Sequence, residues 1–234
     1  MKNRIIESAI LAFGLLMLGL FIQNGIKSFA QRDRAVSVKG LAEKEVQADR
    51  VIWPLPFKEV GDDLQLLYNS LETKNKTVVT FLKSNGVKDD EISISAPVVF
   101  DKDAERYGGT NTSPYRYNAT SVITVTSNQV DLVRRLMTEQ GSLLKQGIAI
   151  TGGDYDYRTE FLFTKLNEIK PQMIEEATKN AREAAVKFAE DSKSKLGKIK
   201  SANQGQFSIS ERDANSPYIK NVRVVSTVEY YLKD

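Results

Sequence analysis

The first thirty residues show an apolar pattern unlike that of the rest of the chain. An uncharged apolar run extends from Ser8 to Ile22, after Lys2 and Arg4. A basic start before such a run is typical of an export signal, whereas a full membrane span needs about 20 apolar residues. The pattern predicts an N-terminal apolar helix within residues 1–30. This segment would be retained as a signal anchor in the membrane or, alternatively, be cleaved after Ala30 as a signal peptide.

A buried helix of a soluble protein is a third interpretation of the same run. Such a helix would normally carry a polar stripe on its exposed side, and residues 8–22 carry none. The segment therefore favours a protein anchored in the inner membrane and facing the periplasm, or a periplasmic protein after signal cleavage.

Alternating apolar and polar positions beyond residue 34 predict a series of β-strands. Pro54 and Pro56 interrupt the second strand, and because proline cannot donate to a sheet ladder, this strand is expected at an edge or a bulge. Residues 101–114 are charged, then rich in Gly, Thr, Asn and Ser, which is typical of a loop. The predicted strands are Ala35–Gln47, Arg50–Val60, Glu91–Phe100, Tyr115–Thr126, Gly147–Thr151, Tyr155–Phe163, Lys198–Ile209 and Val222–Leu232.

Apolar residues at helical spacing predict three main helices. The first follows the pair Asp62-Asp63, either of which suits an N-cap, and ends at Asn85-Gly86. The second covers residues 130–144. The third has Pro171 in its first turn, carries a stripe of alanines that permits close packing, and ends at Gly197.

The predicted order of elements is β-β-α-β-β-α-β-β-α-β-β. Long helices between antiparallel pairs of strands favour an α+β fold in which the helices pack on the sheet. Part of this order, β-α-β-β-α-β, matches a split βαβ unit. We therefore expect an α+β domain over residues 35–234, after the N-terminal helix.

Two residue types that most active sites use are missing from the chain, which has no histidine and no cysteine. Histidine is the usual general base near neutral pH and the commonest metal ligand. Catalytic triads with histidine, HExxH zinc sites and thiolate sites are therefore excluded. The formal net charge is +3, and most of it lies in the first thirty residues. The near-neutral body argues against nucleic-acid binding.

Carboxylates are one of the remaining routes to catalysis or metal binding. Asp101, Asp103 and Glu105 stand at alternate positions before the glycine-rich loop, and hard cations such as Ca²⁺ prefer clustered oxygen ligands. Asp154 and Asp156 could form a pair of carboxylates. In both places a solvated loop or strand is the simpler interpretation, so the sequence predicts no metal site, no cofactor and no catalytic residue.

Aromatic and arginine side chains gather around the same loop. Tyrosine and arginine are enriched among residues that anchor protein interfaces, although an ordinary solvent-facing hairpin could have the same composition. Trp53 lies between residues that favour β-structure, where a tryptophan usually packs in the core. The candidate interaction residues are Arg106, Tyr107, Tyr115, Arg116, Tyr117 and Trp53.

Several segments resemble the SIMPL domain family. The entry strand Val36-Ser37-Val38-Lys39-Gly40, with the acidic stretch after it, resembles the start of that domain, and the strand at 117–126 is similar too. The alanine-rich segment Asn180–Ala185, followed by Leu196-Gly197-Lys198-Ile199, gives the strongest similarity. The resemblance covers roughly residues 35–232.

This resemblance implies a bacterial periplasmic or outer-surface domain related to the periplasmic immunogenic proteins, which are associated with oxidative-stress defence. It implies no cofactor and no agreed active site. We therefore expect a non-enzymatic envelope protein that acts as a binding or self-assembly module, with itself or an unknown protein as its partner. The alternative is a carboxylate-dependent hydrolase of cell-envelope glycans, which would hold two carboxyl groups about 5–9.5 Å apart across a cleft.

Overall fold

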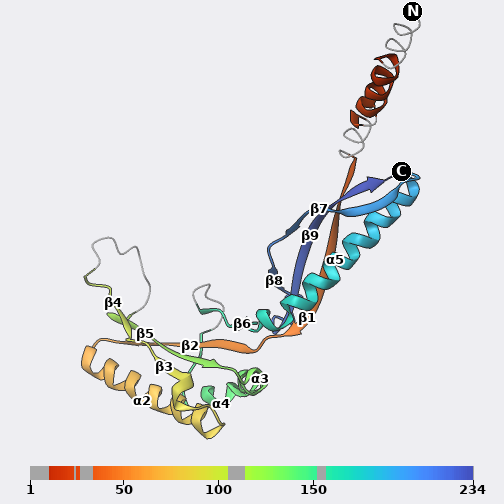
Figure 1. Ribbon diagram of the computed structural model, residues 1–234. Helices are drawn as coiled ribbons and strands as arrows, with labels where there is room; N and C mark the ends of the chain where they lie inside the picture. The colour runs from red at the N-terminus through yellow and green to blue at the C-terminus, as the bar shows by residue number, and fades with distance from the viewer. Residues whose placement is uncertain (1–10, 24, 27–33, 105–113, 152–156, 234) are drawn as a thin grey trace, which may run out of the picture. The chain divides into compact units, whose positions relative to one another are not determined.

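The computed structural model contains two compact units, drawn in Figure 1. It describes residues 11–23, 25–26, 34–104, 114–151 and 157–233. The first unit contains residues 1–44, 167–209 and 222–234, and the second contains residues 45–166 and 210–221. Both units combine an antiparallel sheet with helices. The structure therefore confirms the predicted α+β class.

The sheet of the second unit is built around two long antiparallel strands. Its strand order is β3-β5-β2-β6, and β4 also pairs with β5. β2 and β5 stay in register from Val51↔Ser127 to Gly61↔Tyr117. The strands are β2 (Arg50–Gly61), β3 (Ile92–Ile94), β4 (Val98–Asp101), β5 (Tyr117–Ser127) and β6 (Glu160–Leu162).

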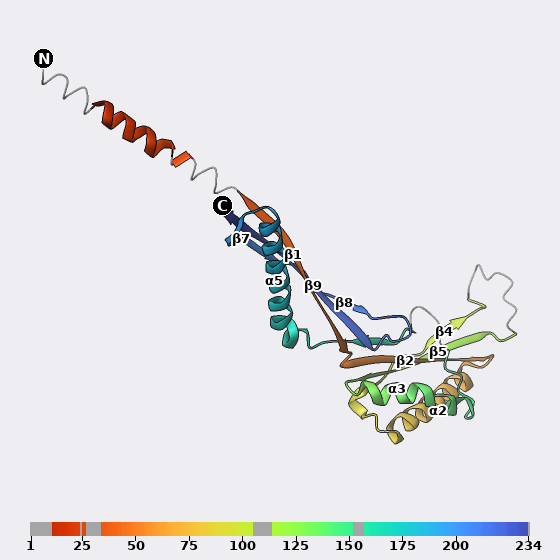
Figure 2. The ribbon, with the colours of Figure 1, turned by 90° about the vertical axis from the view of Figure 1, so that its right-hand side faces the viewer.

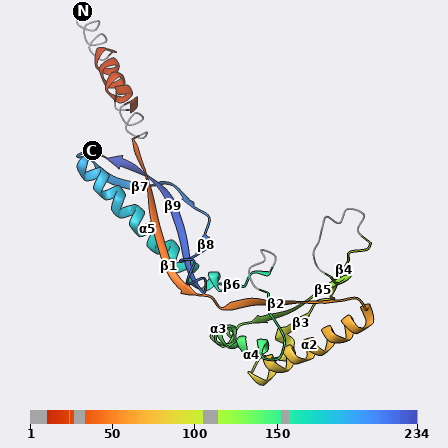
Figure 3. The same cartoon turned by 180° about the vertical axis from the view of Figure 1, so that it is seen from behind.

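Three helices lie on one side of β2 and β5, as Figure 1 and Figure 3 show. They are α2 (Leu64–Ser84), α3 (Val130–Glu139) and α4 (Gly141–Leu144), with a 3-10 turn, η1 (Asp89–Glu91), after α2. The predicted cap of α2 is confirmed, since the Asp63 carboxylate accepts a hydrogen bond from Leu66 N–H at 2.9 Å. Gly86, at φ 96°, follows the helix end as expected.

The core of the second unit consists of large side chains from alternate strand positions. Because successive strand residues point to opposite faces, the buried odd-numbered residues of β2 and β5 all face the helices. The other face of this sheet, which we name the open face, carries the even-numbered residues. The largest buried side chains include Val51, Leu55, Phe57, Leu71, Val78, Leu82, Ile123, Val125, Leu136, Leu143 and Ile148.

The backbone nitrogen and carbonyl groups of Pro54 and Pro56 point away from β5. Thr151 N–H donates to the Pro56 carbonyl at 2.8 Å, and the nitrogen and carbonyl of one strand residue point to the same side. On that side β6 pairs only with residues 50–52. β2 lies between β5 and β6, so the predicted edge or bulge is wrong. Among the described residues, however, the proline half of β2 meets no continuous ladder on this side, and proline is tolerated there as it is on an edge strand.

The first unit pairs one long helix with a second sheet, as Figure 1 and Figure 2 show. The strand order is β1-β9-β7, and β8 also pairs with β9. Its elements are β1 (Ala35–Gln47), α5 (Leu166–Asp191), β7 (Lys195–Gln204), β8 (Ser208–Glu211) and β9 (Ile219–Lys233). Small side chains dominate the buried stripe of α5, namely Met173, Ala177, Ala181, Ala185 and Ala189.

Gly40 lets β1 approach α5 very closely. A Cβ atom at this position would lie 1.9 Å from the carbonyl oxygen of Ala177 and 2.8 Å from the Cβ of Ala181. No side chain larger than hydrogen fits between this strand and this helix. The prediction that the alanine stripe permits close packing is therefore confirmed, and Gly40 is its counterpart on the sheet.

The boundaries of the third helix differ from the prediction. It begins at Leu166, so Pro171 lies inside the helix and not in its first turn. Pro171 is exposed, so water can satisfy the carbonyl that loses its N–H partner. The helix ends at Asp191, before Lys193 adopts the left-handed conformation (φ 55°). Gly197, predicted as the helix end, is a residue of β7.

Three other predicted elements are divided in the structure. The predicted strand Lys198–Ile209 is interrupted at residues 205–207, between β7 and β8. The predicted strand Glu91–Phe100 becomes β3 and β4, separated by Ser95-Ala96-Pro97. Proline at the break fits a bulge in an edge strand. The predicted second helix becomes α3 and α4, with Gln140 between them.

Residues 11–23 are helical, as the apolar run predicts, and their side chains are exposed. None of the helices that the structure describes is long and apolar enough to cross a membrane. The predicted membrane-spanning anchor is therefore not supported by these residues. The predicted cleavage site after Ala30 lies outside the described residues.

Candidate interaction surface

β3 and β4 lie one after the other along the same side of β5. β3 pairs with Ile123–Val125 and β4 pairs with Tyr117–Thr120. Between the pairs Ile94↔Ile123 and Val98↔Thr120, the edge advances four residues while β5 advances three. The two strands thus form one edge strand with a bulge, and we name residues 92–101 the β3–β4 edge.

The β3–β4 edge carries a run of exposed apolar side chains. The exposed fraction is 68% for Val98, 42% for Val99 and 42% for Phe100, and Ile94 is 51% exposed. Val98 pairs with Thr120 and Phe100 with Asn118, so both side chains lie on the open face. Contiguous exposed apolar side chains are characteristic of interaction sites.

The hydrogen-bond pattern fixes which backbone groups of β4 point outward. Lys102 N–H donates to the Arg116 carbonyl at 3.1 Å. Inward and outward pairs alternate along an antiparallel ladder, so Phe100 and Val98 also bond to β5. The N–H groups of Val99 and Asp101 therefore point away from the sheet.

Arg116 holds the end of β4 against the start of β5. Its Nε and Nη2 donate to the two carboxylate oxygens of Asp101 at 3.0 and 2.8 Å, and Nε lies 3.2 Å from Asp103. Its backbone N–H donates to Asp62 at 2.9 Å, and its guanidinium lies 4.9 Å from the ring centre of Tyr117. This planar, bidentate geometry orients the β4 terminus with more precision than a point charge would.

The same contacts shift the ionisation of both partners. The hydrogen bonds from Arg116, helped by backbone N–H donors at positions 103 and 104, lower the pKa of Asp101. The pKa of Arg116 is raised, chiefly by its hydrogen bond to Asp101. Both groups are therefore charged at neutral pH. The two hydrogen bonds from Arg116 to the Asp101 carboxylate, which we name the clamp, are intact at that pH.

The predicted interaction residues do not all lie together. Tyr115 is 43% exposed and directly precedes Arg116 and Tyr117 beside β4, so these three residues adjoin the β3–β4 edge. Trp53 is only 3% exposed and packs in the core of the second unit. It therefore contributes to folding and offers no contact surface.

Arg106 and Tyr107, the remaining predicted interaction residues, lie outside the described residues. Sequence reasoning missed Val98 and Phe100, since the pattern of residues 91–100 indicated only a strand. Pro97, inside that predicted strand, is a sequence signal that could have indicated an edge position.

The acidic residues considered for catalysis or metal binding are only partly described. Asp101 and Asp103 both bind Arg116, so they face a cation of the protein itself. Glu105, Asp154 and Asp156 lie outside the described residues. In the part of the chain that the structure describes, no group of three acidic side chains is placed to hold a metal ion.

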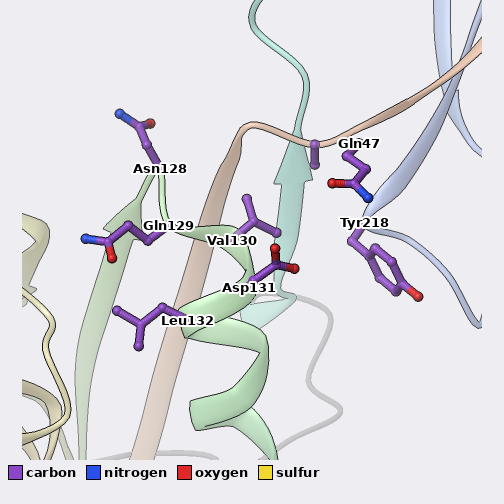
Figure 4. A pocket seen from close by; sticks show the side chains of 8 residues that line it. Gln47, Asn128, Gln129, Val130, Asp131, Leu132 and Tyr218 are labelled. Carbon is purple, nitrogen blue, oxygen red and sulfur yellow. The ribbon is translucent and has the colours of Figure 1, made fainter.

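A pocket of about 370 Å³ opens at the start of α3, and Figure 4 shows its lining side chains. Among the eight lining residues, Asp131 is the only acid, and its carboxylate pairs with Arg134 at 3.2 Å. Arg134 also stacks on the ring of Tyr218 at 3.4 Å. Glycoside hydrolysis generally uses two carboxyl groups, and the lining of this pocket provides one. The pocket is lined by Gln47, Ala48, Asn128, Gln129, Val130, Asp131, Leu132 and Tyr218, all from the second unit.

A second hollow, of about 480 Å³, lies along α2 and includes Gln146. The hydroxyls of Thr73, Thr77 and Thr80 donate to carbonyls of the same helix one turn earlier. These hydroxyls therefore satisfy carbonyls of their own helix.

Comparison with known families decides the relationship that the sequence suggested. A family model matches residues 36–229, and its description reads "SIMPL: Protein of unknown function (DUF541)". The chain belongs to the SIMPL family. The matched region includes strands and helices of both units, and the resemblance drawn from the entry strand and the alanine-rich helix is confirmed. No curated protein matches the chain.

The family description assigns no activity to SIMPL proteins. It names neither a reaction nor a partner. The geometry of the exposed surfaces is the remaining guide to function.

Proposed function

We propose that this SIMPL protein is exported to the cell envelope and works there as a non-enzymatic contact module. The observation that carries the proposal is the β3–β4 edge, where Val98, Val99 and Phe100 are exposed on a strand with outward-pointing N–H groups. An edge strand of this kind is a template for pairing with another strand. Strand addition uses backbone hydrogen bonds for affinity and alternate side chains for specificity.

β7, an edge strand in the sheet of the first unit, lacks this character. β7 carries Lys195, Lys198 and Lys200, and its pairing with β9 shifts register twice. Lysines and bulges are devices by which proteins prevent unwanted strand pairing. The protection of β7 supports the view that the uncharged run on β4 is a contact surface.

Two features support a role without catalysis. The chain has neither histidine nor cysteine, and Asp101 and Asp103 are both bound to Arg116 instead of facing each other across a cleft. In this proposal, a link to oxidative-stress defence would also act through contact, because there is no thiol to sense or reduce an oxidant.

Export is the second part of the proposal, and the basic, apolar start of the chain supports it. Fusing the full chain to a C-terminal reporter enzyme that is active only outside the cytoplasm tests it. We expect reporter activity, and we expect it to disappear when Leu15 and Leu16 are both replaced by Arg. Equal activity without residues 1–30 would contradict export by this segment.

Site-specific photo-cross-linking in intact cells tests the contact surface. A photoreactive residue in place of Val98 should give discrete protein adducts, because position 98 is 68% exposed on the β3–β4 edge. The matched control is Ile199, which is 51% exposed on the protected strand β7. Equal adduct yields at both positions, or none at position 98, would contradict the proposal.

A further inference from the structure

The outward backbone groups of β4 form a self-complementary set. Val99 presents both its N–H and its carbonyl. Asp101 presents an N–H, while its carbonyl already accepts a hydrogen bond from Ala104 N–H at 3.2 Å. Pro97, on the other side of Val99, has a carbonyl but no N–H. A two-fold rotation about Val99 places Asp101 of one copy opposite Pro97 of the other. Asp101, whose carbonyl is occupied, then faces a residue that has no N–H to donate.

We infer that β4 pairs antiparallel with β4 of a second copy of this chain, across a two-fold axis at Val99. This inference rests on the proposed contact function and names its partner. The two Val99 residues exchange two hydrogen bonds, and each Asp101 N–H donates to the Pro97 carbonyl of the other copy. The same patch serves on both chains, as a closed two-fold dimer requires.

The side chains match in the same register. Val98 lies opposite Phe100 of the other copy, and the symmetry repeats this pair. Positions 98 and 100 form non-hydrogen-bonded pairs in this ladder, which bring side chains closest together. Aromatic residues opposite β-branched residues are a favourable cross-strand combination. Both side chains lie on the open face, so the pairing covers Phe100 and Val98, which is the most exposed apolar side chain of the β3–β4 edge.

Charge also favours this register. The clamp from Arg116 holds the Asp101 carboxylate within its own copy, and Asp101 lies opposite Pro97, which has no charge. A register centred on Phe100 would place Val98 opposite Lys102 and leave the Pro97 carbonyl without a donor. Compared with the register centred on Phe100, an axis at Val99 leaves fewer backbone groups without a hydrogen-bond partner and places no lysine opposite an apolar residue.

Single cysteines test this geometry cleanly, because the chain has no cysteine of its own. Two residues 99 in a hydrogen-bonded pair would have Cα atoms about 5.5 Å apart, within the range of about 4.4–6.8 Å that a disulfide spans. The experiment compares full-length Val99→Cys, Phe100→Cys and Ile199→Cys after mild oxidation and, separately, a short bifunctional thiol reagent. Fluorescence of Trp53, the single tryptophan, checks that each variant is folded.

We expect Val99→Cys to give at least about tenfold more covalent homodimer than either other variant. We also expect Val99→Pro, which removes an outward N–H and leaves the hydrogen-bonding groups of β4 that face β5 in place, to abolish association of the uncross-linked chain in light scattering. Preferential cross-linking at position 100 would overturn the register. A strictly monomeric chain that still gives adducts from position 98 to another protein would overturn the second copy as partner, while the contact surface would stand. If the chain forms no homodimer and gives no adduct from position 98, the proposed contact function is contradicted as well.

Discussion

In both units helices pack on a sheet, but the residues at the contact differ. In the second unit, large side chains such as Leu55, Phe57 and Ile123 fill the space between sheet and helices. In the first unit, α5 presents alanines, and Gly40 meets them with no side chain at all. Large side chains bury more apolar area per residue, whereas small ones gain close backbone contact. The second unit is therefore sensitive to loss of volume, and the first unit to gain of volume.

The two sheets also differ in the residues that their edge strands expose. β7 of the first unit carries lysines and bulges, whereas β4 of the second unit carries exposed valines and a phenylalanine. Protection on one edge and exposure on the other show that uncharged edges are not a general property of this chain. The contrast teaches that a contact surface is best recognised against a protected edge in the same molecule.

Removing volume from the second unit should have the largest effect. Trp53→Ala should lower the free energy of unfolding by about 3–5 kcal/mol, because a buried aromatic leaves a cavity that neighbours fill only partly. Urea unfolding followed by far-UV circular dichroism measures this. Tyr115→Ala, at an exposed position, should change stability by no more than about 0.5 kcal/mol. A Trp53→Ala protein as stable as the Tyr115→Ala protein would refute the core assignment.

Adding volume to the first unit should come next. Gly40→Ala should destabilise the protein by about 3 kcal/mol, the upper part of the usual range for overpacking, because the new methyl would meet helix backbone that cannot move aside. The control is Gly61→Ala, whose methyl would contact only Leu67 Cδ1 at 3.7 Å. Thermal unfolding of both variants measures the difference. Similar melting temperatures would mean that β1 and α5 are less tightly packed than described.

Removing charge from the protected edge should have a smaller effect. Lys195→Val combined with Lys198→Val should strengthen concentration-dependent association about tenfold, or ~1.4 kcal/mol, because β7 would lose its guard against strand pairing. Analytical ultracentrifugation compares this variant with Lys179→Ala combined with Lys187→Ala, which removes the same charge from α5. Equal association of the two variants would attribute the effect to net charge alone.

The smallest effect concerns pH and the surface carboxylates. Hydrogen bonds from Arg116, Arg212 and Lys200 lower the pKa values of Asp101, Asp213 and Glu229 respectively. A carboxyl whose pKa is lower in the folded state adds stability that is fully present above its unfolded pKa, about 3.9 for Asp and 4.3 for Glu. That stability is lost as the pH falls through the lowered folded values.

Arg116→Gln isolates the contribution of Asp101. Since exposed ion pairs contribute little, this variant should melt no more than about 2 °C below the unchanged chain at pH 7. The gap should narrow below about pH 4, as Asp101 becomes protonated in both proteins. A gap that stays constant from pH 7 to pH 3 would assign the effect of Arg116 to packing on Tyr117 and not to charge.

Local patterns along the chain determined much about this protein. Periods of two and of three to four residues predicted most of the strands and helices, since each period reports one buried face. Asp63 and Asn85-Gly86 marked the ends of α2 because caps act on neighbouring residues. The missing histidine and cysteine, and the SIMPL resemblance in the alanine-rich helix, are likewise properties of the sequence alone.

Tertiary structure decided the features that depend on distant residues. Only the fold placed Gly40 against Ala177, divided the predicted strand 91–100 at its bulge, and left Val98 exposed. The preference of a residue for a strand differs between central and edge positions, because it reflects packing against neighbours across the sheet. Which strand lies at an edge depends on pairings between residues far apart in the chain, and the sequence does not display them.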